Sequence, residues 1–78
     1  MSMEGEGVLV TSIRPSRDFH ALMVRLFAAS GEPEQVALKW ADPKRVFRSD
    51  LQEARGPELE GPIELPAYGV VTLRVEPR

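Results

Sequence analysis

The sequence predicts a small all-β domain, an immunoglobulin-like antiparallel β-sandwich of about six to seven strands. Short runs of alternating apolar and polar residues recur at intervals of roughly ten residues, bounded by turn-forming residues. The chain contains seven prolines and six glycines, which supply those turns. No confident helix lies between the runs, which disfavours a parallel sheet because parallel strands need a crossover connection. A length of 78 residues suits one such domain, which we place at residues 8–78.

Order is expected to begin near Val8. Residues 1–7 mix methionine, serine, glutamate and glycine without a period, which indicates a disordered leader or an added start of the chain. The β-branched run at residues 8–13 predicts the first strand. The proline, serine and aspartate that follow at residues 15–18 predict the turn that ends it.

The run Phe19–Ala29 could form a strand or a helix, since its alanine, leucine and methionine content suits both. Its period favours the strand. Leu22, Val24 and Leu26 would share one buried face. Met23, Arg25 and Phe27 would lie on the opposite face. A helix remains the alternative.

The later strands follow the same two-residue period. We expect strands at residues 35–41, around Val46 and Phe47, at residues 63–65 and in the last run before the end of the sequence. Leu51, between the second and third of these, is expected to point inward. The last strand is expected to pair between earlier strands and lock the sheet. The predicted inward positions are Val36, Leu38, Trp40, Val71, Leu73 and Val75.

Composition narrows the classes of function. The formal net charge of −2 disfavours binding to a nucleic-acid backbone. The absence of cysteine excludes disulfides and thiolate metal sites. No apolar run approaches the length that spans a bilayer, and the acidic start of the chain is unlike a secretory signal. We therefore expect a cytoplasmic domain that is held together by packing alone.

The residues indicate no active site: we expect no catalytic, cofactor-binding or metal-binding residue. His20 is the single histidine, and no Gly-x-Ser-x-Gly motif accompanies it. Two acid pairs, Asp50 with Glu53 and Glu58 with Glu60, have spacings that occur by chance in a chain with 12 acidic residues. The candidate carbohydrate contacts are Tyr68 and Trp40, because aromatic rings stack on sugars. The position of Trp40 in its strand also suits the core.

Three segments together resemble a known domain. They are "LMVRLFAASGEP" at residues 22–33, "DLQE" at residues 50–53 and "LPAYGVVTLRV" at residues 65–75. In this combination they resemble the small C-terminal β-sandwich of alpha-mannosidase-type glycoside hydrolases (family thirty-eight), or a similar accessory sandwich of another glycosidase. The zinc site and the catalytic aspartate of such enzymes lie in earlier domains, so the resemblance implies a non-catalytic accessory domain.

The resemblance also implies the partner, namely the catalytic domains of a parent glycosidase, reached through an apolar docking patch. Two other functions stay open: a free-standing carbohydrate-binding module, and a small adaptor that pairs through an exposed strand edge. Within the domain, Arg25 is expected to form an ion pair near Asp50 or Glu53 and so to tie the second strand to the segment after Phe47.

Overall fold

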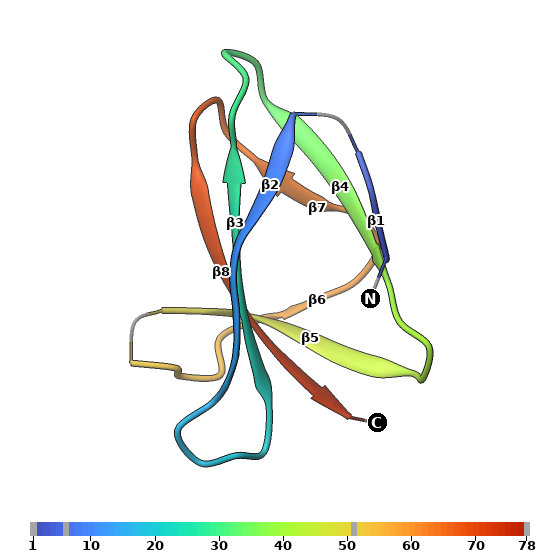
Figure 1. Cartoon of the computed structure of the whole chain (residues 1–78), viewed down its shortest axis with the longest axis vertical. Helices are drawn as coiled ribbons and strands as arrows, with labels where there is room; N and C mark the ends of the chain where they lie inside the picture. Colours follow the sequence, from blue (N-terminus) through green and yellow to red (C-terminus); the bar gives the residue numbers. More distant parts are fainter. Residues whose placement is uncertain (1, 6, 51, 78) are drawn as a thin grey trace.

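The computed structural model describes residues 2–5, 7–50 and 52–77, and these residues form two antiparallel sheets packed face to face (Figure 1). The smaller sheet has the strand order β1-β4-β7, and the larger has the order β2-β3-β8-β5-β6. The predicted all-β sandwich is confirmed. The described strands number eight, more than the predicted six to seven: β1 (Ser2–Glu4), β2 (Val8–Pro15), β3 (Leu22–Ala28), β4 (Glu34–Lys39), β5 (Lys44–Ser49), β6 (Glu58–Leu59), β7 (Ile63–Leu65) and β8 (Val70–Pro77).

The two strands that the sequence analysis did not predict, β1 and β6, are short edge strands. β1 lies within residues 1–7, where a disordered leader was expected, and it pairs antiparallel with β4. A segment of this length is too short for a two-residue period to show, and its pairing depends on the edge that β4 offers. Gly5 permits the close approach after β1, because a Cβ atom there would lie 2.8 Å from the backbone oxygen of Gln35.

The run Phe19–Ala29 contains strand β3 and no helix, which confirms the interpretation by period. β3 pairs with β2 on one side and with β8 on the other, and β8 in turn pairs with β5. The last strand is therefore flanked by partners on both edges, as predicted (Figure 1). A central strand contributes hydrogen bonds to two neighbours, so β8 joins the two halves of the larger sheet.

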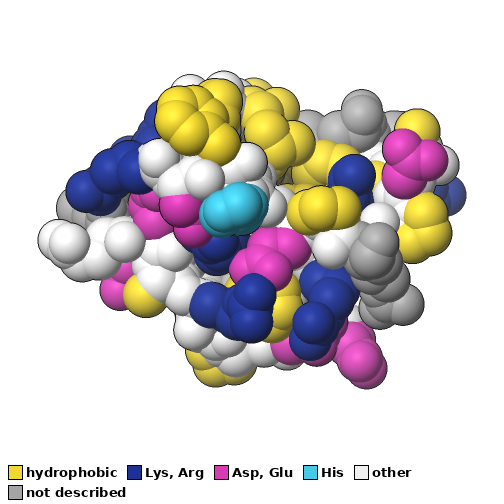
Figure 2. Space-filling view, turned by 90° about the horizontal axis from the view of Figure 1, so that it is seen from below, with side chains coloured by type: hydrophobic (Ala, Val, Ile, Leu, Met, Phe, Trp, Pro, Cys, Tyr) yellow, Lys and Arg dark blue, Asp and Glu magenta, His cyan; other side chains and the backbone are white. Residues whose placement is uncertain are grey.

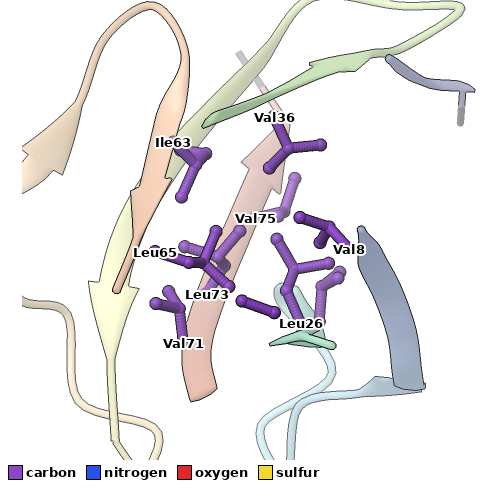
Figure 3. Close-up of a cluster of buried hydrophobic side chains, with 10 residues drawn as sticks. Val8, Leu26, Val36, Ile63, Leu65, Val71, Leu73 and Val75 are labelled. Carbon is purple, nitrogen blue, oxygen red and sulfur yellow. The ribbon is translucent and has the colours of Figure 1, made fainter. Parts of the chain in front are cut away.

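The core lies between the sheets and is entirely aliphatic (Figure 3). The predicted inward residues Val24 and Leu26 of β3 and Leu73 of β8 are fully buried. Trp40 is partly buried against this cluster, in agreement with its predicted inward position. Leu51 lies outside the described residues. The buried cluster consists of Val8, Val24, Leu26, Ala28, Val36, Ile63, Leu65, Val71, Leu73 and Val75.

The smaller sheet covers only part of the larger one, whose lower end extends beyond it (Figure 1). Leu22 is therefore 37% exposed, although it shares the inner face of β3 with Val24 and Leu26. Ile13, the partner of Val24 on β2, is 51% exposed for the same reason. The described residues include no helix of a length and apolarity that would cross a membrane.

Candidate docking surface and the ionic network behind it

The turn between β2 and β3 is fixed by a fully buried serine. Ser16 Oγ accepts a hydrogen bond of 3.1 Å from the backbone N–H of Ala21 and donates one to Asp18 Oδ1. The backbone N–H of Ser16 donates to the Ala21 oxygen at 2.9 Å. Asp18 Oδ1 also accepts from the backbone N–H of His20 at 3.0 Å. These bonds close the turn from both ends and define the path of the residues at its tip.

Phe19 lies at the tip of this turn with its ring in solvent. Its side chain is 82% exposed, and its φ of 59° lies in the left-handed region that a residue with a Cβ atom adopts at a cost. The Phe19 N–H donates to the Ser16 oxygen at 3.0 Å. The turn thus holds a large apolar side chain away from the core in a strained backbone conformation.

Other apolar side chains surround Phe19 at the same end of the sandwich. We call Ile13, Pro15, Phe19, Leu22 and Pro77 the apolar end surface. Ile13 lies two residues before Pro15, so the two share one face of β2. In Figure 2 hydrophobic side chains border one side of the single histidine on the face in view. A shallow hollow of about 270 Å³ lies in this surface, lined by Pro15, Phe19, His20, Ala21, Leu22, Lys44, Val75 and Pro77.

Charged side chains gather on the other side of the histidine in Figure 2. We call Arg14, Arg17, Asp18, Glu53, Arg55, Arg74 and Glu76 the ionic network. The Glu53 side chain is nearly buried, and its φ is 63°. Glu53 accepts from the Arg17 backbone N–H at 2.7 Å and from Arg14 Nη1 at 2.7 Å. The Arg17 N–H and then the Arg14 guanidinium lower the pKa of Glu53. The loop after β5 is in this way fastened to the turn after β2.

Arg74 of β8 forms the centre of the ionic network. Its Nη2 donates to Asp18 at 3.0 Å, its Nε donates to Glu76 at 2.9 Å, and its Nη1 donates to the Glu53 backbone oxygen at 3.3 Å. Arg55 Nε reaches Glu76 at 2.9 Å. The pKa of Asp18 is lowered, chiefly by the Ser16 hydroxyl, and that of Glu76 chiefly by Arg55. The β2–β3 turn, β8 and the loop after β5 thus share one set of charge-assisted bonds.

An apolar residue lies beneath the network on the outer face of the larger sheet. The Phe47 ring is buried, and the guanidinium carbons of Arg45 and Arg55 lie 5.1 Å and 4.9 Å from its centre. Guanidinium groups at such distances interact favourably with an aromatic face. Met23, which was predicted to lie on the face opposite Val24, is buried on the same outer face as Phe47. The outer face of the larger sheet therefore carries a second, smaller group of buried apolar side chains.

The expected ion pair of Arg25 is wrong. Glu53 pairs with Arg14 and Arg17, and the Arg25 side chain has no ion pair with any described residue. The register explains the difference: Arg25 lies opposite Ser12 and Thr72, whereas Arg14, which pairs with Glu53, lies opposite Met23, two residues away along β3. Arg14 of β2, instead of Arg25, joins the loop after β5 to a strand.

The two candidate carbohydrate contacts lie apart. Tyr68 is 64% exposed in the loop between β7 and β8, where its hydroxyl lies beside Gly31, before the start of β4. Trp40 follows the end of β4, a strand of six residues that spans about 20 Å. The two rings therefore do not form one platform. Trp40 instead lines a groove of about 500 Å³ beside β5 and β6.

The remaining candidates take structural positions. His20 is exposed, Asp50 Oδ1 accepts the backbone N–H of Gln52 at 2.9 Å, and Glu58 pairs with Arg45 at 3.1 Å. No group of three or more metal-ligating side chains occurs among the residues that the structure describes. No protein-family model, curated protein or solved structure matches the chain.

Proposed function

We propose that this chain is a non-catalytic accessory β-sandwich that docks, through the apolar end surface, against the catalytic domains of a glycoside hydrolase of the alpha-mannosidase type. The observation that carries the proposal is the exposure of Phe19 at the tip of a closed turn. Large apolar side chains grouped at one end of a small domain are typical of a protein interface.

Positive φ occurs at Tyr68 as well, so the backbone of the turn favours docking at Phe19 only together with the apolar side chains that line the hollow beside it. A residue with a Cβ atom in the left-handed region costs roughly 1–2 kcal/mol relative to ordinary conformations. Such a cost persists where the surroundings fix the conformation, and it is concentrated at binding sites. The bonds made by Ser16 and Asp18 fix Phe19 before a partner arrives, which reduces the ordering entropy of association.

The resemblance to glycosidase sandwiches supports the class of partner. Two of its three segments contain β3 and most of β8, which are paired strands in the larger sheet. The resemblance therefore covers a contiguous structural unit rather than scattered positions. The apolar end surface includes residues at the ends of these same strands, Leu22 and Pro77.

The proposal is tested by site-specific photo-crosslinking in the native host. A photoreactive phenylalanine analogue replaces Phe19 in one variant and Tyr68 in a matched control. Both positions hold exposed aromatic rings at positive φ, at different ends of the sandwich. We expect a cross-link to a glycoside hydrolase from position 19 and none from position 68. Equal labelling from both positions, or a partner of another class, would contradict the proposal.

A second candidate function is a free-standing carbohydrate-binding module. The observation that favours it is the groove beside Trp40, whose lining includes Lys44, Glu58 and Leu59. An aromatic ring flanked by polar groups suits sugar binding. Trp40 is the single tryptophan, so its fluorescence reports on this groove alone. A saturable change on titration with mannosides, xylans or starch oligomers would support this function, and a flat response would remove it.

A further inference from the structure

A row of polar residues crosses the outer face of the larger sheet above the ionic network. Ser12 of β2 lies opposite Arg25 of β3, Arg25 lies opposite Thr72 of β8, and Thr72 lies opposite Ser49 of β5. Cross-strand partners point to the same face, so these side chains are neighbours. Arg25 lies in the interior of the row.

An irregularity in β2 places Ser12 in this row. The register between β2 and β3 shifts between Val10 and Ser12, so that Thr11 is the extra residue. Thr11 Oγ1 donates to the Arg25 backbone oxygen at 3.2 Å. With uninterrupted alternation from Leu9, Ser12 would point to the inner face. Bulges commonly re-aim a side chain in this way, and here the result is a second hydroxyl beside Arg25.

The row borders a hollow of about 210 Å³. Its lining contains the buried Met23, two guanidinium groups and two hydroxyl groups but no carboxylate. The Arg25 side chain has no hydrogen-bond or ion-pair partner among the described residues, whereas Arg14 is held by Glu53. The lining residues are Ser12, Arg14, Met23, Val24, Arg25 and Thr72.

We infer that this hollow binds a phosphate group, with Arg25 as the main ligand and Ser12 and Thr72 as hydroxyl donors. A guanidinium fork and hydroxyl groups around one hollow offer several donors to an oxyanion. The volume equals about seven water molecules at roughly 30 Å³ each, which accommodates a phosphate and part of its hydration shell. The net charge of −2 opposes general attraction of anions, so binding depends on these local donors.

The phosphate group could belong to the free ion or to a sugar phosphate, and the experiment separates the two. The full chain, labelled with ¹⁵N, is titrated with inorganic phosphate and with a hexose 6-phosphate at constant ionic strength in sodium chloride. We expect saturable amide shifts at Ser12, Arg25 and Thr72 with at least one of them. Tighter binding of the ester identifies a sugar phosphate, and equal or weaker binding identifies the free ion.

Matched variants assign the binding to Arg25. Arg48 is the control, because it is exposed on β5 and lies opposite Leu73, on the other face of the sheet. We expect Arg25→Gln to weaken phosphate binding by about tenfold or more, as expected for loss of a charge-assisted bond. Arg48→Gln should bind as the unmodified chain does. Thr72→Val keeps the branched shape of the side chain and should weaken phosphate binding several-fold. This variant provides the test if Arg25→Gln does not fold.

Three results would overturn the inference. The first is shifts that rise linearly and spread over other arginines with both probes. The second is equal weakening by Arg25→Gln and Arg48→Gln, since this would indicate general charge attraction. The third is acetate binding as tightly as phosphate, since a planar carboxylate would then be the better description of the ligand. The site is independent of docking at the β2–β3 turn, so the two proposals can fail separately.

Discussion

Replacement of Ser16 by alanine tests how the docking turn is held. Ser16 is 0% exposed, and its Oγ is the acceptor for the backbone N–H of Ala21, which is itself buried. Alanine removes the acceptor and leaves this donor without a partner. A buried donor left unsatisfied costs about 1–3 kcal/mol. A domain of this length has a free energy of unfolding of only about 4–12 kcal/mol, so the loss is a substantial part of the total.

The assay is urea unfolding at neutral pH, followed by tryptophan fluorescence, with Ser12→Ala as the matched control. The Ser12 side chain makes no hydrogen bond with any described residue, so this variant should stay within about 0.5 kcal/mol of the unmodified chain. For a domain of this size each 1 kcal/mol shifts Tm by about 4–8 °C. We therefore expect Ser16→Ala to have a clearly lower urea midpoint, and a clearly lower Tm in a parallel thermal scan, than Ser12→Ala.

The amide spectrum supplies the second measurement. In Ser16→Ala the signals of Phe19 and His20 should move, because the turn loses the group that binds both Ala21 and Asp18. If both serine variants lose the same free energy and the turn signals stay in place, then Ser16 does not determine the conformation of Phe19, and the argument for a pre-ordered docking turn fails.

Two further predictions follow from the network and the turn. In the folded chain the carboxyl groups of Asp18, Glu53 and Glu76 have lowered pKa values. Their contribution to stability is therefore full above the ordinary carboxyl pKa of about 4, and it is lost progressively as the pH falls below that value. Urea midpoints measured from pH 7 down to pH 3 should fall, and a flat profile would show that the network adds no stability. Replacement of Phe19 by glycine should raise the free energy of unfolding by about 1 kcal/mol, because glycine adopts positive φ without strain and the exposed ring loses little burial. Phe19→Ala keeps the strain and should give no such gain in the same denaturation assay.

The alternation of residues predicted the strands that carry the core. Val24, Leu26 and Leu73 were assigned to inner faces from the two-residue period, and all three are fully buried. The period has this power because successive side chains of a strand point to opposite faces and one face is covered by the second sheet. The period wrongly predicts that Leu22 is buried, because the smaller sheet does not extend over this residue. The two-residue period carries no information about where the covering sheet ends.

The ionic network could not be predicted from the sequence, because its members come together only through the tertiary fold. Arg14 and Glu53 are 39 residues apart, and Asp18 and Arg74 are 56 residues apart. Alternation along β5 marks Phe47 as pointing away from Val46, but it does not show that Arg55 of the loop after β5 lies over the ring. The expected partner of Arg25 was wrong for the same reason, since the choice among several arginines depends on strand register.

The backbone itself connects the network to the proposed docking surface. Among the described residues other than glycine, positive φ occurs at Phe19, Glu53 and Tyr68. Phe19 and Glu53 lie at the tips of two different loops, and the Glu53 carboxylate accepts the N–H of Arg17, two residues before Phe19. The strained backbone at Glu53 thus positions the carboxylate that accepts the Arg17 N–H and holds the β2–β3 turn. The shape of the surface around Phe19 therefore depends on the loop after β5. We expect substitutions at Glu53 to weaken the proposed docking even if Glu53 itself does not contact the partner.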